Sequence, residues 1–244
     1  MSASLKSALR LLLVFAVLAA TYFLYPKQSA QRNALANRTA ATQGLAAYLA
    51  RTYPGKRALV LANPFTLKKG QRREIYQFEQ AGIRGLRLGF GKNVILEAIV
   101  YPDLRREFLE NPGSVYVDPQ TITPLSYLVA ENAFDKAALE HPGCDLIVSL
   151  IGLPVGVTRT ELWRNVGSPK LALLLPDWGM IGDRDAVREA FHSGKLSAAV
   201  LNRPGATPEG QPLEKDRLAA FANRFLLVTA ETIDEMMRTH PQLF

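Results

Sequence analysis

The chain of 244 residues has one cysteine and three histidines, and this scarcity excludes several kinds of site. A lone Cys144 cannot form an intramolecular disulfide. The cysteine and histidines lack the spacing of a metal site, and no Gly-x-Ser-x-Gly, Gly-x-Gly-x-x-Gly or phosphate-loop sequence is present. We therefore expect no metal ion and no cofactor, and the sequence contains none of these catalytic motifs.

Acidic residues are absent from the first 73 positions, where twelve lysines and arginines occur; the first acid is Glu74. The remaining residues contain seventeen basic and twenty-two acidic side chains, so the net charge of +7 belongs to the start of the chain. A nucleic-acid-binding domain carries its positive charge on the folded body, and this distribution argues against nucleic acid as a partner. A basic segment beside a bilayer is attracted to anionic headgroups, although acid-poor flanks also accompany membrane-insertion signals.

An apolar run, Leu11–Leu24, lies near the N-terminus between Arg10 and Lys27. The sixteen residues between those charges span about 24 Å as a helix. This is short of the ~20 residues of a full span, but arginine and lysine side chains can extend toward the headgroups. We expect an uncleaved transmembrane anchor that contacts the lipid bilayer. The alternative is a signal peptide cleaved after Ala19 or Ala20, which would leave an apolar stub on the mature chain.

The orientation of this anchor depends on the charges around it. Lys6 and Arg10 precede the apolar run, which is usual for export of the following domain, whereas Lys27, Arg32 and Arg38 follow it closely. Charge alone therefore leaves both orientations open. We expect a single-pass membrane protein whose domain lies on the extracytoplasmic side.

Composition divides the chain into an anchor over residues 1–28, a helical stalk over 29–54 and a domain over 55–244. The stalk is rich in Ala, Gln, Asn and Arg and ends at Pro54-Gly55. Its weak apolar stripe consists of Leu35, Leu45, Tyr48 and Leu49.

Short apolar runs recur after residue 55 and alternate with amphipathic stretches. The runs are Ala58–Ala62, Leu86–Phe90, Val115–Val117, Asp145–Ile151, Leu171–Leu175, Ala198–Leu201 and Phe225–Thr229. Four of them are continuously apolar, which is typical of central parallel strands covered on both faces. A further segment, Val94–Tyr101, fits either a strand or a helix that Pro102 ends.

Helix signals lie between these runs. The stretch Arg72–Ala81 is amphipathic, and Thr123 followed by proline predicts a helix that continues to about Glu140. Asp183 is expected to cap a third helix, and Thr232 to Glu235 has the pattern of a capping box. The alternation of strands and helices predicts an α/β fold with a doubly wound, mainly parallel, Rossmann-like sheet.

In such sheets a ligand binds beyond the carboxyl ends of the strands. The residues expected there are Asn63, Phe65, Gly152, Asp177, Trp178, Asn202, Arg203 and Thr229. Trp178 could stack on a small polar solute and Arg203 could bind an anion. Strand ends also need turn formers, and several of these residues are of that kind. The sequence Asp177-Trp178-Gly179 is the strongest candidate because an acid, a large ring and a glycine together exceed what a turn requires.

A cluster of cations, Lys68-Lys69-Gly70-Gln71-Arg72-Arg73, follows the first predicted strand. These side chains could contact phosphate or lipid headgroups. A solvated charge run is the alternative, and the sequence favours it.

Residues 134–203 resemble part of a type I periplasmic-binding-protein lobe, in the succession of GCDLIVSLIG, KLALLLPDW and GKLSAAVLNRPG. The resemblance implies an α/β lobe that takes part in binding a solute. That family has two lobes, and this chain has room for one lobe or an incomplete pair.

These observations lead to the hypothesis of a membrane-anchored, non-catalytic module that binds a small polar solute or a protein partner. One alternative is a membrane-tethered hydrolase or transferase that uses strand-end acids such as Asp177. Another is a structural component of an envelope complex.

Overall fold

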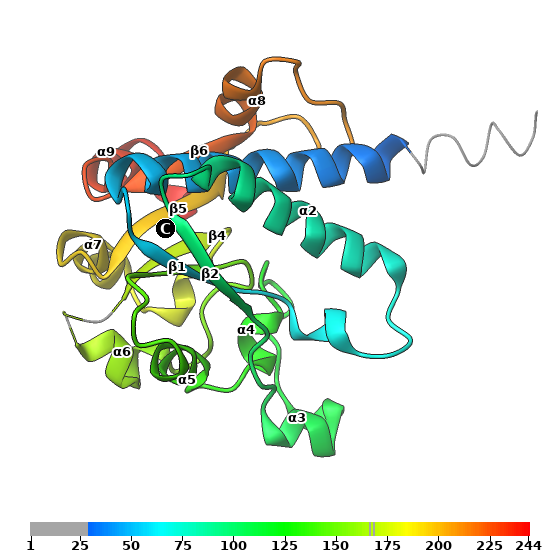
Figure 1. Ribbon diagram of the computed structural model, residues 1–244, viewed down its shortest axis with the longest axis vertical. Coiled ribbons are helices and arrows are strands. Elements are labelled where there is room, and N and C mark those ends of the chain that lie inside the picture. Colours follow the sequence, from blue (N-terminus) through cyan, green and yellow to red (C-terminus); the bar gives the residue numbers. More distant parts are fainter. Residues whose placement is uncertain (1–28, 166, 168) are drawn as a thin grey trace, which may run out of the picture.

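In a computed structural model that describes residues 29–165, 167 and 169–244, six strands form one sheet in the order β2-β1-β3-β4-β5-β6 (Figure 1). The strands are β1 (Arg57–Leu61), β2 (Ile95–Val100), β3 (Leu146–Ser149), β4 (Lys170–Leu174), β5 (Leu196–Asn202) and β6 (Phe225–Thr229). The first five run parallel, and β6 runs antiparallel to β5. The α/β fold with a mainly parallel sheet is confirmed.

The helices connect these strands and cover both faces of the sheet. After an N-terminal helix over 29–52, the α-helices are α2 (Arg73–Phe90), α3 (Arg106–Glu110), α4 (Leu125–Leu128), α5 (Ala133–Glu140), α6 (Glu161–Arg164), α7 (Arg184–His192), α8 (Arg217–Arg224) and α9 (Ile233–Thr239). Short 3₁₀ turns are η1 (Pro64–Leu67), η2 (Pro112–Ser114), η3 (Val157–Arg159), η4 (Trp178–Met180) and η5 (Pro241–Leu243).

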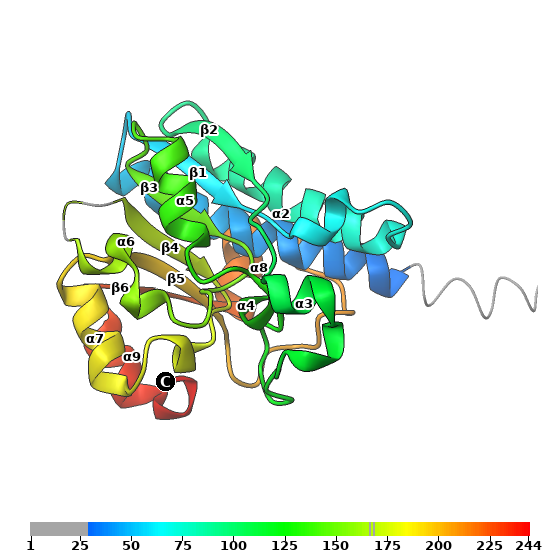
Figure 2. The ribbon, with the colours of Figure 1, turned by 90° about the horizontal axis from the view of Figure 1, so that it is seen from below.

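The sheet has one apolar core on each face. The N-terminal helix and α2 cover one face, where Leu45 and Leu86 are fully buried, and Phe221 of α8 packs at the same core. Helices α5, α6, α7 and α9 cover the other face, with Phe134 and Phe191 among the largest buried side chains. Figure 2 shows α5 and α6 on the opposite side of the sheet from the N-terminal helix.

Two of the predicted strands are wrong. Leu86–Phe90 is the last part of α2, because Leu86 and Phe90 lie four residues apart on its buried face while Leu88 is half exposed. Val115–Val117 forms no strand: it follows η2, and Tyr116 in its centre is 73% exposed. The ambiguous segment Val94–Tyr101 is strand β2.

The predicted helix from Thr123 to Glu140 is interrupted. Helix α4 ends at Leu128, and the next residue, Val129, has an extended backbone and forms a bridge with Leu104; the chain becomes helical again in α5. The cap at Asp183 is confirmed, since its carboxylate accepts a hydrogen bond from the Ala186 amide at 2.9 Å.

The expected capping box at Thr232 does not form. Thr232 directly precedes α9, but its hydroxyl accepts a hydrogen bond from the Thr229 amide at 2.9 Å and does not cap the helix. The Thr232 hydroxyl therefore binds the end of β6, although the sequence pattern predicted that it would cap α9.

The helix expected over 29–54 is present over 29–52, and it packs against the sheet. Leu45, Ala46 and Leu49 are fully buried in the same core as α2. This helix therefore shares the interior of the α/β unit and does not stand apart from it as a stalk.

Glycines bring the N-terminal helix and α2 into close contact. A Cβ on Gly85 would collide with Thr42 and with the backbone of Thr39, and a Cβ on Gly89 would collide with Gln43. Thr39 lies beside the middle of α2 and Gln43 beside its end, so the two helices run side by side in the same direction.

No helix in the described part of the chain is long and apolar enough to cross a membrane. The anchor expected at Leu11–Leu24 lies outside the described residues, and it stays a prediction.

Candidate binding site at the carboxyl edge of the sheet

The carboxyl ends of the parallel strands meet at one edge, and they bring most of the eight predicted residues to that edge. Thr229 is the exception. It pairs with Ala198 near the start of β5, whereas Asn202 at the end of β5 pairs with Phe225. Because β6 is antiparallel, its carboxyl end lies at the opposite edge, away from the other predicted residues.

Asn63 and Phe65 form a turn after β1. The side-chain oxygen of Asn63 accepts a hydrogen bond from the Phe65 amide at 2.9 Å, which caps η1. The Phe65 ring packs edge-on against Phe108, with ring centroids 5.9 Å apart. The Asn63 side chain is thus used by the turn, as the turn-former alternative expected.

Gly152 and Asp177 are also enclosed by contacts within the fold. Gly152 has φ +79°, and a Cβ there would lie 2.7 Å from the Ser126 hydroxyl. The Asp177 carboxylate accepts hydrogen bonds from the Gly179 amide at 3.1 Å and from the Thr121 hydroxyl at 2.6 Å. Both carboxylate oxygens of Asp177 therefore have partners within the fold.

Trp178 lies in the core rather than on a binding surface. Its ring stacks on Phe244 with centroids 5.7 Å apart and contacts Phe191 at 6.1 Å, and only 8% of the residue is exposed. Its indole nitrogen is buried without a hydrogen-bond partner. Trp178 thus offers no exposed face for stacking on a solute.

A buried ion pair bridges the ends of β1 and β3. Arg38 of the N-terminal helix lies 3.6 Å from Glu79 of α2, and their side chains are 9% and 4% exposed. Glu79 accepts a hydrogen bond from the Asn63 amide at 2.8 Å, and Arg38 donates one to the Leu150 carbonyl at 3.0 Å. The guanidinium also lies 4.8 Å from the centre of the Phe78 ring.

This ion pair lies at the point where the chain changes direction across the sheet, because β1 has β2 on one side and β3 on the other. Ligands of doubly wound sheets bind in the crevice at such a point. Here Arg38 and Glu79 bind backbone groups that follow β3 and β1, on both sides of this point.

Burial acts against both charges of the pair. It lowers the pKa of the Arg38 guanidinium, with Glu79 opposing the shift, and it raises the pKa of the Glu79 carboxyl, with Arg38 opposing the shift. The Arg38 Nε is buried without a hydrogen-bond partner. Each charge therefore depends on the other for compensation.

A cavity of about 270 Å³ lies further along the same edge, at the ends of β4 and β5. The N-terminal helix and the loop after β5 form its walls. Its polar lining consists of Asn37, Arg38, Asn202, Arg203, Thr207, Glu209 and Arg224. Its apolar lining includes Phe78 and Leu175.

The loop that forms the rim of this cavity is fastened by Arg224. The guanidinium donates four hydrogen bonds of 2.8 to 3.0 Å to the carbonyls of Thr207, Pro208, Gln211 and Pro212. The Asn37 side-chain amide binds the Glu209 carbonyl at 2.6 Å from the other wall. The rim is therefore held from both sides.

Backbone strain marks the end of β4. Leu175 has φ +48°, the only positive φ of a non-glycine residue among those described. Such a conformation costs about 1–3 kcal/mol and concentrates at ligand sites. Leu175 lines the cavity, so the strain and the hollow occur together.

Two of the predicted residues, Asn202 and Arg203, line this cavity, while Asn37 and Arg38 were missed. The sequence placed the last two in a stalk outside the domain. One signal could have found Arg38: it lies seven residues before Leu45 and hence on the same face of the helix.

Two polar side chains of the cavity have hydrogen-bonding groups without a partner in the described structure. Arg203 Nε donates to the Ala222 carbonyl at 2.6 Å, and its remaining guanidinium nitrogens make no other hydrogen bond in the described structure. The side chain of Asn202 is likewise uncommitted and exposed. Among the described residues, no group of three or more His, Cys, Asp or Glu could hold a metal ion.

No family model matches the sequence, and no curated protein matches it. Among solved structures, the chain is similar to a protein of Mycobacterium smegmatis, at 13% identity and a TM-score of 0.49 over 84% of this chain and 62% of that one. It is similar to an ABC transporter periplasmic solute-binding protein of Actinobacillus succinogenes with bound D-allose, at 12% identity and 0.48 over 82% and 61%. A third is the substrate-binding protein of a sugar ABC transport system of Bordetella parapertussis, at 12% identity and 0.46 over 84% and 58%.

The chain thus spans less than two thirds of the length of these structures. The resemblance noted over residues 134–203 named the class of the Actinobacillus succinogenes protein, the periplasmic binding proteins.

Proposed function

We propose that this protein is a non-catalytic binding module, held at a membrane by Leu11–Leu24, that binds a small anionic solute at the ends of β4 and β5. One observation carries the proposal. Asn202 makes no side-chain hydrogen bond, and Arg203 keeps two guanidinium nitrogens without a partner in the described structure, whereas Asn37, Arg38 and Arg224 hold the walls of the cavity.

Charge and size define the solute. Of the three arginines in the lining, Arg38 is paired with Glu79. Arg203 and Arg224 remain against one acid, Glu209, so the field of the cavity favours an anion. Guanidinium groups bind carboxylates and phosphates through paired hydrogen bonds. Drug-sized ligands occupy sites of roughly 300–1,000 Å³, so a cavity of about 270 Å³ suits a smaller molecule.

The tether and its side are part of the proposal. The apolar run between Arg10 and Lys27 supports an uncleaved anchor, and the lead with Lys6 supports an extracytoplasmic domain. A module placed there would hold its solute close to the membrane. Protease digestion of intact cells tests the side, since an extracytoplasmic domain is degraded without lysis.

Binding is tested by isothermal titration of the full chain in detergent with citrate, inorganic phosphate, glucose 6-phosphate and neutral glucose. We expect an anionic member of this set to bind and Arg203→Ala to weaken it about 10- to 100-fold, as charge-assisted hydrogen bonds contribute about 1.5–3 kcal/mol. Asn202→Ala is expected to weaken binding less.

Arg106→Ala is the matched control, because this arginine is exposed on α3 and, among the described residues, pairs with Glu110 alone. Equal affinity of the Arg203→Ala variant and the parent would contradict the site. Chemical conversion of the bound solute would contradict the non-catalytic role.

A further inference from the structure

The segment from the last residue of η1 to the first residue of α2 is a cationic surface loop, here called the basic loop (residues 67–73). It contains Lys68, Lys69, Arg72 and Arg73, all exposed, and no acid; Glu74 follows it. The side chains of Lys69, Arg72 and Arg73 make no ion pair in the described structure. These cations are therefore available to an external partner.

Aromatic contacts hold the basic loop in a defined position. The Lys68 ammonium lies 4.8 Å from the centre of the Phe65 ring and 5.8 Å from that of Phe108 on α3. Leu67 at the start of the loop is 66% exposed, and Leu109 on α3 is exposed as well. The loop thus presents cations beside an apolar margin.

The basic loop lies at the end of the molecule where the N-terminal helix begins. Gln31 donates a hydrogen bond to Gln77 at 2.9 Å, and Gln31 and Ala34 line one hollow together with Glu74 and Ile75. The N-terminal helix and α2 therefore start side by side. In Figures 1 and 2 the start of the N-terminal helix and the loop after η1 lie toward the same end.

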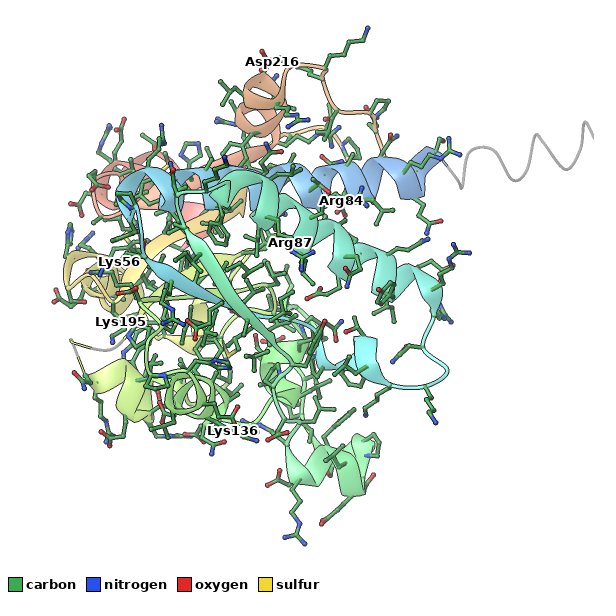
Figure 3. The ribbon with its side chains drawn as sticks, in the orientation of Figure 1. Lys56, Arg84, Arg87, Lys136, Lys195 and Asp216 are labelled. Carbon is green, nitrogen blue, oxygen red and sulfur yellow. The ribbon has the colours of Figure 1, made fainter. Side chains whose placement is uncertain are left out.

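The opposite end of the molecule belongs to the amino edge of the sheet. Lys56 and Lys195, which directly precede β1 and β5, lie away from the basic loop in Figure 3. The carboxyl ends of the parallel strands, and the cavity beside them, thus face the same general direction as the basic loop.

The proposed tether would keep this end close to a bilayer, and the inference rests on that part of the proposed function. Four residues separate Leu24 from residue 29. A fully extended chain spans at most ~3.6 Å per residue, so the start of the helix stays within roughly 20 Å of the anchor.

We infer that the basic loop is a docking surface for anionic lipid headgroups, with Leu67 entering the interfacial region. Charge complementarity selects this occupant. Each cation near an anionic membrane surface strengthens the attraction about fivefold. Docking would orient the module so that the carboxyl edge of the sheet, with its cavity, faces the bilayer.

The test places a probe on the full chain. Leu67→Cys is labelled with an environment-sensitive fluorophore and incorporated into phosphatidylcholine vesicles with or without 30 mol% phosphatidylglycerol, both containing a lipid-attached quencher. Leu139→Cys is the control, because Leu139 is 80% exposed near the end of α5, which leads into the amino end of β3. The native Cys144 is buried and does not compete for label.

We expect strong quenching at position 67 in anionic vesicles, weaker quenching in neutral vesicles or at high salt, and none at position 139. Replacing the four cations of the basic loop by glutamine is expected to abolish the difference between the two vesicle types. Flotation of the vesicles is measured on the same samples.

The outcomes separate the two proposals. A chain that floats with both vesicle types while the probe at 67 is unquenched overturns the docking surface and leaves the tether. A chain that floats only with anionic vesicles and is quenched at 67 overturns the tether and supports docking. A chain that floats with neither overturns both. Quenching that is equal in neutral and anionic vesicles overturns the electrostatic basis of docking.

Discussion

Loss of one partner of the buried Arg38–Glu79 pair should destabilise the protein far more than loss of both. Arg38→Met leaves the Glu79 carboxylate with the Asn63 amide as its remaining partner, at a side-chain exposure of 4%. Glu79→Gln keeps an oxygen for that amide but leaves the guanidinium uncompensated. Removing one member of a buried pair costs about 3–5 kcal/mol, and we expect each single variant to lie in that range.

The double variant Arg38→Met/Glu79→Gln contains no charge at either position. Its main loss is the hydrogen bond to the Leu150 carbonyl, at 3.0 Å in the parent. An unsatisfied buried acceptor costs about 1–3 kcal/mol. The double variant no longer buries two charges, and the desolvation penalty that it avoids offsets part of this cost. We expect the double variant to lose about 1–2 kcal/mol, less than either single variant.

The assay is urea unfolding of the full chain in detergent, followed by circular dichroism at pH 5 and pH 8. Burial raises the pKa of Glu79 in the folded state above its unfolded value of about 4.3. The contribution of Glu79 to the stability of the fold is therefore fully present below the unfolded pKa. It is lost as pH rises through the folded pKa. Arg38→Met, which removes the opposing charge, should cost less at pH 5 than at pH 8.

Glu79→Gln serves as the control for this pH dependence, since it has no carboxyl to titrate at position 79. The reasoning is refuted if the cost of the double variant equals the sum of the two single costs. It is also refuted if the cost of Arg38→Met is the same at both pH values.

Three further predictions concern other buried contacts. Gly85→Val should destabilise the protein by at least about 1–3 kcal/mol in urea unfolding, because its side chain would overlap Thr42 where the two helices touch; equal stability would contradict that close contact. Burial raises the pKa of Cys144 to about 11, so the thiol should react with an aromatic disulfide reagent at pH 8 only after unfolding, and rapid reaction of the native chain would be evidence against its burial. Lys195 donates hydrogen bonds to the carbonyls of Leu162 and Asn165, both at 2.6 Å, and burial lowers its pKa. The contribution of Lys195 to stability is therefore lost as pH falls through the folded pKa. The stability of the parent relative to Lys195→Met, measured by urea unfolding, should rise between pH 8 and pH 10.5.

Continuous apolar runs predicted the central strands because a strand covered on both faces needs no polar side. β1, β3 and β4 are buried almost throughout, in agreement with this rule. The run Phe225–Thr229 has the same composition, yet it forms an antiparallel edge strand. Strand direction depends on how the preceding loop and α8 return the chain to the sheet, and composition does not encode it. The position of Thr229 could therefore not be predicted from its run.

The mistaken strand Leu86–Phe90 shows how tertiary contact decides a local ambiguity. Its alternating apolar residues fit a strand, and the glycines at 82, 85 and 89 lower the helix propensity of the segment. Those glycines lie against Arg38, Thr42 and Gln43 of the N-terminal helix. They favour a helix only when a second helix lies close enough to require small residues. That second helix is the N-terminal helix, which the sequence predicted as a stalk outside the domain.

The residues missed at the cavity share this cause. Arg38 lies seven positions before Leu45, and Glu79 lies seven before Leu86, so each charge falls on the buried face of its helix. On a helix that stands apart in solvent, such a charge is unremarkable. Two helices that each carry one charge of opposite sign on an apolar face fit together as a buried pair, because neither face can be covered unless the charges meet. Matching those faces would have placed the N-terminal helix on the sheet, and with it Asn37 and Arg38 in the wall of the cavity.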